Sequence, residues 1–433
     1  MPTPPEMNIN ERRKYLKRQQ PWYQKANRKE RSHLLGDMMA MTGLNRKYLI
    51  QLMNSNLERK PRQRQRGATY GPEVKAVLSM LAESLDFVCG KRLKPVLLDT
   101  AYNLQQYGHL ELNPELEQAL AKVSVSTLDR LMSPHSYQDM KLPRNKPSAG
   151  KNKIQQAVPV STIPWNESEP GHFEVDLVHH GGADPSGDFI YTLQMIDVLT
   201  GWSERYAILG KSHVVMEDAL RVLQHRLPFL IKEIHTDNGS EFLNAHLHRF
   251  WSEQSPKVQL SRSRPSYKND ARFVEQKNAT LVRAYLQNNR YDTVAQMWAI
   301  NYLYEVMGLF YNLFQPVMRL EQKIWSTDSQ GSRSVKRIYG DAATPLQRLL
   351  STNVLNPEQE AAIRQLYRNT DLRALHSEVY RQLFQVKLMP NAMPGEQQNI
   401  YHTLTQFRPN SEKGDWQPKL DYHLTQQLLL AYP

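Results

Sequence analysis

The sequence lacks several features that define common classes of protein. It has one cysteine, Cys89, so it can form neither an intrachain disulfide nor a cluster of thiolate zinc ligands. It has no run of about 18 apolar residues, the length needed to span a membrane. The N-terminus, MPTPPEMNIN, lacks the apolar core of a secretion signal. We therefore expect a soluble, cytoplasmic protein with no membrane partner.

What the chain does have is an uneven distribution of charge. Its 433 residues carry a formal net charge of +12, and 40% of them are hydrophobic, which is enough for folded cores. Residues 1–165 contain 27 Lys and Arg against 14 Asp and Glu, whereas the remaining 268 residues contain 28 against 29. The basic first part is expected to bind a polyanion, placing the protein with the nucleoid. The length indicates two to four domains.

Residues 1–66 favour a basic arm followed by a helix-turn-helix unit. The polar, basic residues 1–29 form an arm, a short helix or a solvated tail. Residues 30–54 then have apolar residues at helical spacing on both sides of Thr42-Gly43-Leu44. An ordinary helical hairpin is the alternative. The residues expected to contact DNA open the second helix or lie in the run RKPRQRQR: Asn45, Arg46, Lys47, Tyr48, Arg62, Arg64 and Arg66.

Residues 67–133 favour a second helical DNA-binding unit. A helix is expected after Gly71, a basic break over 90–95, a helix over 96–107, and another helix that Asn113 caps. A cap-rich start at Ser124 resembles the opening of a recognition helix. There Ser126, Thr127 and Arg130 would face DNA, unless the helix only packs. Residues 134–165, rich in Pro, Lys, Ser and Gly, predict a flexible basic linker.

Residues 166–320 predict an α/β domain. Strands are expected near 173–177, 189–198 and 202–209, then a helix over 213–226, a strand over 231–235, a helix over 244–253 and a strand over 258–261. Helices over 273–287 and 294–312 follow. The order βββαβαβα is that of the ribonuclease H-like fold, although other α/β domains would give a similar pattern. Residues 321–433 are expected to be mainly helical, with no catalytic constellation.

Three acidic residues have settings that favour metal-dependent phosphodiester chemistry. Asp176 lies within the first expected strand, Asp237 follows the fourth strand, and Glu275 lies near the start of a helix. An acid inside a strand is costly unless it is paired or binds a metal. Two Mg²⁺ ions, with Mn²⁺ as an alternative, would activate the attacking oxygen and stabilise the leaving oxygen of DNA. Adjacent His179 and His180 would point to opposite faces of a strand, which disfavours a metal pair.

The motifs around these acids resemble those of a known family. Residues 235–242, HTDNGSEF, look like the TDNGSEF signature of DDE integrases and transposases, and 264–278 resemble a block of bacterial DDE transposases with a retroviral-type integrase core. RYDT at 290–293 and NLFQP at 312–316 resemble that group too. The resemblance implies that Asp176, Asp237 and Glu275 are the catalytic and metal-binding triad.

The same resemblance suggests what the chain acts on and with what it assembles. It implies 3′-end nicking and strand transfer of a mobile element, and a homo-multimer that bridges two element ends and target DNA. The resemblance leaves open whether an accessory ATPase is a further partner. On the helix of Glu275, Lys277 and Arg283 would meet DNA phosphates or would simply be solvated. A DNA-binding regulator derived from a transposase, and a structure-specific nuclease on the same fold, are the alternative functions.

Overall fold

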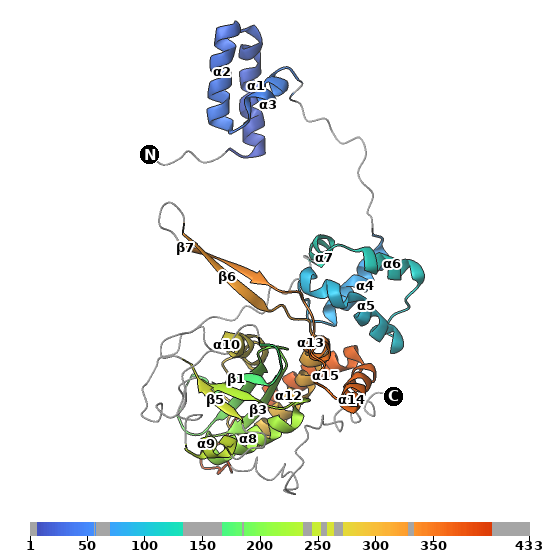
Figure 1. Ribbon diagram of the computed structural model, residues 1–433, viewed down its shortest axis with the longest axis vertical. Coiled ribbons are helices and arrows are strands. Elements are labelled where there is room, and N and C mark those ends of the chain that lie inside the picture. The colour runs from blue at the N-terminus through green and yellow to red at the C-terminus, as the bar shows by residue number, and fades with distance from the viewer. Residues whose placement is uncertain are drawn as a thin grey trace. The chain divides into compact units, whose positions relative to one another are not determined.

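The computed structural model describes most of the chain outside the longest polar stretches. The described residues are 7–55, 57, 70–132, 167–183, 186–236, 245–252, 258–263, 272–327 and 333–400. The chain divides into two compact units, residues 1–69 and 70–433 (Figure 1). The expected linker over 134–165 and the cations Arg62, Arg64 and Arg66 lie outside the described residues.

The first unit is a bundle of three helices, α1 (Ile9–Lys25), α2 (Arg28–Thr42) and α3 (Arg46–Met53). Capping boxes start α1 and α2, and Gly43 ends α2 in the left-handed conformation with a φ of 68°. The turn at Gly43 is therefore as predicted. The solvated tail is wrong for residues 9–25, because Leu16 and Tyr23 of α1 are buried in the core of the bundle.

The second unit begins with α4 (Pro72–Glu83), α5 (Gly90–Gln106), α6 (Pro114–Lys122) and α7 (Val125–Met132). Asn113 caps α6 as predicted, its side chain accepting the Leu116 N–H at 2.7 Å. The predicted break over 90–95 is wrong, because α5 already begins at Gly90. Pro95 lies within this helix, and burial of Leu93 and Val96 on one face favours helix despite the missing donor.

These four helices share the hydrophobic core of the second unit. Asp86, between α4 and α5, accepts hydrogen bonds from the Tyr380 hydroxyl at 2.7 Å and the Tyr285 hydroxyl at 3.1 Å, and lies 2.9 Å from His376 Nε2. The Asn103 side chain of α5 donates to the Thr370 carbonyl at 2.9 Å. Residues 70–132 are thereby held to the C-terminal helices as well as to the α/β core.

A five-stranded mixed sheet forms the centre of this unit. Its strands are β1 (His172–His179), β2 (Ile190–Asp197), β3 (Ser203–Leu209), β4 (Glu233–Thr236) and β5 (Gln259–Arg262), in the order β3-β2-β1-β4-β5. The first three strands are antiparallel, and β4 and β5 run parallel to β1. With α8 (His213–Arg226) and α9 (Ala245–Ser252), this confirms the predicted order of elements and is compatible with a ribonuclease H-like core.

The two helices predicted after the sheet are interrupted. The first comprises α10 (Arg272–Lys277), a π-helical turn η3 (Asn278–Arg283) and α11 (Ala284–Leu286). The second is α12 (Val294–Leu309), which continues as the π-helical turn η4 (Phe310–Phe314). The uninterrupted helices predicted over 273–287 and 294–312 are therefore wrong. Such π-helical turns are rare and often occur at functional sites, and η3 directly follows the helix that carries Glu275.

Two asparagines cover the outer edge of the sheet at β3. The Asn301 side chain accepts the Ala207 N–H at 2.6 Å and donates to the Ala207 carbonyl at 2.9 Å. The Asn312 side chain binds Ser203 in the same way, at 3.0 and 3.1 Å. Both amides thus replace a neighbouring strand and satisfy backbone groups that would otherwise be open to pairing.

The C-terminal region was predicted to be mainly helical, and its described part is helical only from residue 345 onward. A two-stranded antiparallel ribbon, β6 (Leu320–Thr327) and β7 (Arg333–Tyr339), precedes α13 (Pro345–Ser351), α14 (Pro357–Arg368) and α15 (Leu372–Leu388). Aromatic and β-branched residues in both strands favour extended pairing over helix. Residues 401–433 lie outside the described residues. No helix within the described ranges is long and apolar enough to cross a bilayer.

Candidate active site

Asp176 lies in the middle of β1, as predicted, and is half-buried. Its Oδ2 accepts a hydrogen bond from Asn278 Nδ2 at 2.6 Å, and its Oδ1 accepts the Leu177 N–H at 2.8 Å. Asn278 opens the π-helical turn η3 and is itself buried. The carboxylate is therefore held against the end of the helix that carries Glu275.

Glu275 lies in the first turn of α10, again as predicted, with its side chain exposed. The start of this helix is fixed by Glu174, a buried acid two residues before Asp176 in β1. Oε2 of Glu174 accepts the N–H groups of Phe273 and Val274 at 2.7 and 3.0 Å. Two unpaired N–H groups at a helix start favour a carboxylate. Glu174 and Asn278 thus bring the helix of Glu275 onto the strand of Asp176.

Asp237 lies outside the described residues, but the strand that leads to it is described. β4 ends at Thr236, which pairs with Val175 in parallel register. Asp176 follows Val175 in β1, and Asp237 follows Thr236 in the sequence. The strand beside β1 therefore ends one residue before Asp237 in the sequence.

The oxygen atoms that could act as metal ligands near Asp176 suit a hard divalent cation. Asp176 and Glu275 supply carboxylate oxygens, which Mg²⁺ prefers. Asn278 Oδ1 is buried and has no hydrogen-bond partner among the described residues, so an acceptor oxygen beside Asp176 is unsatisfied. Within those same residues no group of three His, Cys, Asp or Glu side chains is arranged to hold a metal. A third acid would have to come from elsewhere, and Asp237 is the acid that the sequence offers.

A row of buried polar residues runs across the sheet from Asp176. Asp176 pairs with Gln194 of β2, and Gln194 pairs with Arg205 of β3, so the three share one face. The three guanidinium nitrogens of Arg205 have no hydrogen-bond partner among the described residues. Arg205 packs instead over the rings of Tyr304 and Tyr311, at 5.9 and 5.8 Å from its Cζ. Burial lowers the pKa of its guanidinium.

The two cations predicted on the Glu275 helix lie close to this row. Lys277 is half-buried, and burial, with the nearby charges of Arg205 and Arg92, lowers the pKa of its amine to about 7. Arg283 is half-buried and donates to Asn288 Oδ1 at 3.2 Å. Burial lowers the pKa of Arg283, and the charge of Asp176 opposes that shift. The helix that carries Glu275 therefore places the cation Arg283 near Asp176.

The two adjacent histidines have separate surroundings, as the strand pattern predicted. His179 is exposed, whereas His180 is fully buried, its Nε2 2.8 Å from the Thr192 hydroxyl. Burial lowers the pKa of His180 to about 3, which keeps the imidazole neutral. Among the described residues, no hydrogen bond joins either histidine to Asp176 or Glu275.

The remaining predicted DNA contacts lie on two other helices. Asn45, Arg46, Lys47 and Tyr48 are exposed at the start of α3, where the Asn45 side chain caps the helix by accepting the Lys47 N–H. On α7, Ser126 and Arg130 are exposed and Thr127 is half-buried. Among the described residues, no hydrogen bond or ion pair joins the α7 set to Asp176.

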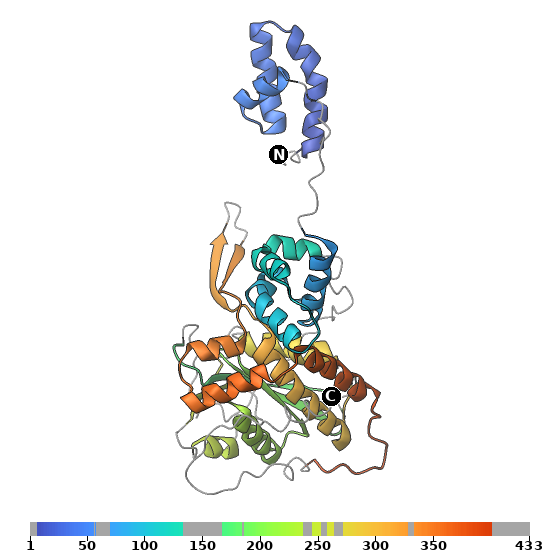
Figure 2. The same ribbon diagram turned by 90° about the vertical axis from the view of Figure 1, so that its right-hand side faces the viewer.

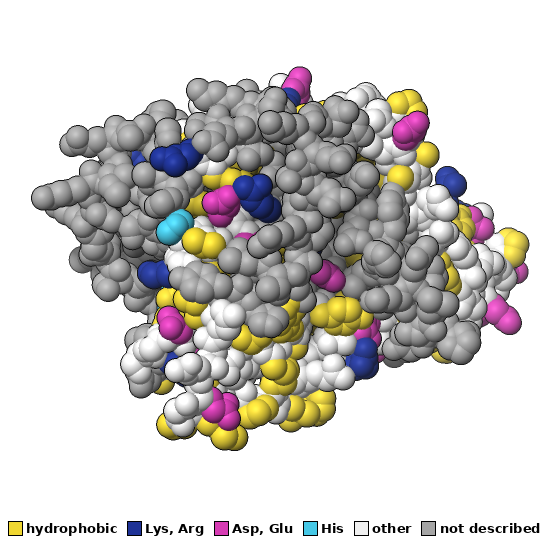
Figure 3. All heavy atoms as spheres, turned by 90° about the horizontal axis from the view of Figure 1, so that it is seen from below, with side chains coloured by type: hydrophobic (Ala, Val, Ile, Leu, Met, Phe, Trp, Pro, Cys, Tyr) yellow, Lys and Arg dark blue, Asp and Glu magenta, His cyan; other side chains and the backbone are white. Residues whose placement is uncertain are grey.

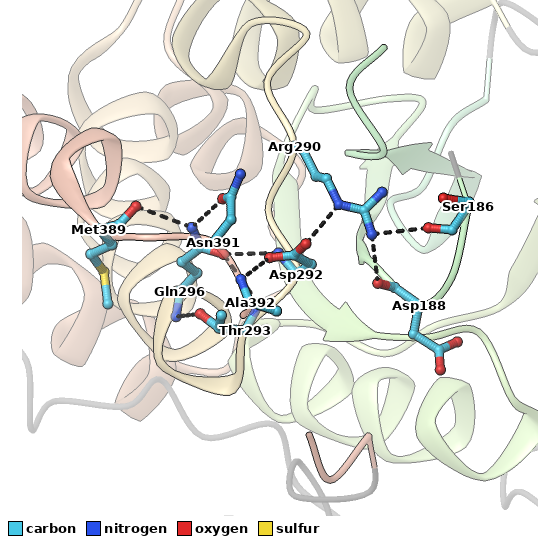
Figure 4. Close-up of polar contacts among 9 residues, drawn as sticks. All are labelled: Ser186, Asp188, Arg290, Asp292, Thr293, Gln296, Met389, Asn391 and Ala392. Carbon is cyan, nitrogen blue, oxygen red and sulfur yellow. Dashed lines mark hydrogen bonds and ion pairs between the residues drawn. The ribbon is translucent and has the colours of Figure 1, made fainter. Parts of the chain in front are cut away.

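The downstream motifs RYDT and NLFQP have structural roles. Arg290 pairs with Asp292 at 2.6 Å and donates to the Ser186 carbonyl at 2.9 Å, while Asp292 accepts the Ala392 N–H at 2.7 Å (Figure 4). These contacts join the β1–β2 loop, the start of α12 and the segment after α15. Asn312 covers β3, as described above. Both motifs therefore stabilise the core and contribute no reactive group.

Sequence reasoning missed Glu174, Asn278 and the buried row that ends at Arg205. Glu174 and Asn278 could have been identified from their spacing in the sequence. Glu174 alternates with Asp176 and so faces the same side of β1, and Asn278 lies three residues after Glu275, which is one helical turn. No sequence pattern could have identified Arg205 as buried, because arginines in strands are usually exposed and the burial of Arg205 depends on α12.

Comparisons with known proteins place the chain in a family. No family model matches it. The catalytic core domain of BIV integrase is similar to 42% of this chain and 95% of that structure, with 13% identity and a TM-score of 0.27. An uncharacterised protein of Sinorhizobium fredii, y4rM, is 34% identical over 328 residues, covering 75% of this chain and 91% of the relative. On this similarity the chain belongs to the same family as y4rM.

Proposed function

We propose that the chain is a DDE-type DNA transposase, which binds the ends of a mobile element and catalyses 3′-end nicking and strand transfer. The observation that carries the proposal is the contact of Asp176 with Asn278, which joins the first acid to the helix of the third. The matching register of β1 and β4, which leads into Asp237, supports the second position. The TDNGSEF-like motif at this point of the sequence agrees with that assignment.

Asp176, Asp237 and Glu275 would hold two Mg²⁺ ions, or Mn²⁺. When bound, such ions activate an attacking oxygen and stabilise the leaving oxygen of a phosphodiester. The protein residues have defined tasks around them. Asn278 orients the Asp176 carboxylate through Nδ2, and Glu174 fixes the backbone that carries Glu275. Arg283 and Lys277 would bind DNA phosphates next to the acids.

The helical units would supply affinity for the element ends. The exposed residues at the start of α3 and on α7, with Arg62, Arg64 and Arg66, would contact phosphates and bases. A multimer would bring two ends and a target together, with or without an accessory ATPase. The charge of residues 1–165 supports this assignment of binding to the first part of the chain.

The test is a joining assay with the purified full chain, a pre-nicked DNA end and a plasmid target. Joined product that requires Mg²⁺ and is lost in Asp237→Asn, Asp176→Asn and Glu275→Gln supports the proposal. Each variant should keep the wild-type melting temperature in the absence of metal and the wild-type affinity for DNA. The end sequence is taken from DNA that flanks the encoding gene.

Other outcomes of the same assay identify the alternatives. Cleaved DNA without joined product indicates a structure-specific nuclease. DNA binding that neither cleaves nor joins, and that the three substitutions leave unchanged, indicates a regulator.

A further inference from the structure

The β6–β7 ribbon projects from the second unit as a separate hairpin (Figures 1 and 2). The Ile324 side chain is 41% exposed and Tyr339 is 42% exposed, while Ser326, Lys336 and Arg337 are exposed as well. An isolated hairpin of two strands is only marginally stable in water. A ribbon of this length that leaves apolar side chains in solvent is expected to gain a partner when the protein acts.

The root of the ribbon is held firmly, so the ribbon points in a defined direction. Val317 and Ala343 exchange two backbone hydrogen bonds, of 3.0 and 3.2 Å. The Arg348 guanidinium crosses the root and donates to three carbonyls, those of Val317, Asp341 and Ala343, at 2.8 to 3.0 Å. A register shift between Leu320 and Gln322 bends the ladder just beyond this root.

The root is also connected to the candidate active site. The Arg319 guanidinium lies over the Phe273 ring, 4.8 Å from its centroid, and Phe273 is the residue whose N–H binds Glu174. Phe273 lies two residues before Glu275 in α10. The ribbon and the helix of Glu275 therefore share a contact, and anything bound along the ribbon is positioned relative to the acids.

The charge of the ribbon selects the kind of partner. Its two strands contain the cations Lys323, Arg333, Lys336 and Arg337 and a single acid, Glu321. The backbone register places Lys323 opposite Arg337, so two cationic residues occupy paired positions of the ribbon. By contrast, the face of the molecule seen in Figure 3 shows described acidic and basic side chains interspersed. The whole chain also carries a formal net charge of +12, so an anionic partner is favoured over a second copy of this chain.

We propose that the β6–β7 ribbon is an arm that lies along duplex DNA and extends the DNA-binding surface beyond the acids. This inference rests on the proposed function, because it takes DNA as the substrate. The major groove, about 12 Å wide, admits a two-stranded ribbon. Strands of seven or eight residues at about 3.3 Å per residue reach roughly 25 Å, or about seven base pairs. Lys336 and Arg337 are exposed cations on opposite faces of β7, so within the groove each would meet phosphates of a different DNA strand.

The experiment measures binding of the full chain to a duplex of mixed sequence by fluorescence anisotropy at several salt concentrations. Each phosphate contact contributes about 0.9 to the slope of log affinity against log salt. Lys336→Gln with Arg337→Gln should therefore lower the slope by about 1.8 and weaken binding several-fold. Lys336→Arg with Arg337→Lys preserves charge and should keep the wild-type slope. Both positions are exposed, so the melting temperature should stay unchanged.

The outcomes distinguish this inference from the proposed function. If the wild-type chain binds duplex DNA and the glutamine variant binds it with the same slope, the ribbon is not a DNA arm. If that variant instead changes the mass of the protein in light scattering, the ribbon is a contact between copies, and the inference is overturned in favour of that role. If the wild-type chain binds no duplex at all, the proposed function itself fails.

Discussion

Asn278 donates a hydrogen bond from Nδ2 to Oδ2 of Asp176 over 2.6 Å, across 102 residues of sequence. The contact joins the middle of β1 to the π-helical turn that follows α10. Because Asn278 is buried and its Oδ1 has no hydrogen-bond partner among the described residues, the amide has one defined orientation and one free acceptor. A side chain that orients a metal-binding carboxylate is expected to affect metal affinity more than stability.

Asn278→Ala should raise the Mg²⁺ concentration needed for half-maximal joining by about 10–100-fold, the usual effect of losing such an orienting partner. Isothermal titration of metal into the DNA-free protein gives the same comparison without catalysis. Asn289→Ala is the matched control, since Asn289 is exposed and its hydrogen bond to the Tyr291 hydroxyl is long, at 3.5 Å. Wild-type metal dependence in Asn278→Ala would show that Asp176 needs no such partner.

Glu174 offers a test of how α10 is attached. Glu174→Ala removes the acceptor of two helix N–H groups and leaves them in a buried place, which should lower the free energy of unfolding by about 2–5 kcal/mol. Glu174→Gln keeps an acceptor oxygen and should cost about 1 kcal/mol. Urea unfolding followed by circular dichroism measures both. Equal losses in the two variants would mean that the helix start does not depend on this acceptor.

The buried imidazole of His180 should make stability depend on pH. Its folded-state pKa is about 3, below the usual 6.5, because burial disfavours the charged form. As the pH falls below 6.5, His180 becomes protonated in the unfolded chain but stays neutral in the folded chain. The free energy of unfolding therefore decreases from about pH 6.5 down to about pH 3. Between pH 7 and pH 5 this group should contribute a loss of about 2 kcal/mol.

His180→Gln should remove that contribution. The variant should be less stable than wild type at pH 7, because the imidazole packs against Thr192 in the core, yet the difference should shrink as the pH falls to 5. Urea unfolding at both pH values gives the comparison. A constant difference between the two proteins would show that His180 does not carry the pH dependence.

The order of elements in the core could be predicted from the sequence because it depends on local patterns. Alternation of Phe173, Val175 and Leu177 with acids identified β1, and the spacing of apolar residues identified α8 over the range observed. The positions of Asp176 in a strand and Glu275 at a helix start followed from the same patterns.

The features that the sequence did not predict depend on tertiary contacts. The π-helical turn at Asn278 has no signature in residue spacing. Helix over 90–95 is favoured by the burial of Leu93, which outweighs Pro95 and the neighbouring cations. The ribbon after residue 320 was missed because the helical patterns beyond it dominated the interpretation of that region. Pairing between two short strands is a non-local property, so it was less visible than helix periodicity.

Arg205 and Arg226 form a pair for the last prediction. Arg205 is fully buried without a hydrogen bond among the described residues, whereas Arg226 is paired with Glu305. Desolvating a cation costs several kcal/mol, against roughly 1–4 kcal/mol for the two contacts with the rings of Tyr304 and Tyr311 together and an attraction from the buried Glu204 carboxylate. Arg205→Met should therefore leave the free energy of unfolding unchanged or raise it by up to about 3 kcal/mol, while Arg226→Met should lower it, because Glu305 loses its ion pair with Arg226. Urea unfolding of both variants checks this. A loss of stability in Arg205→Met would indicate that the guanidinium is satisfied by groups beyond the described residues or by a bound anion beside Asp176.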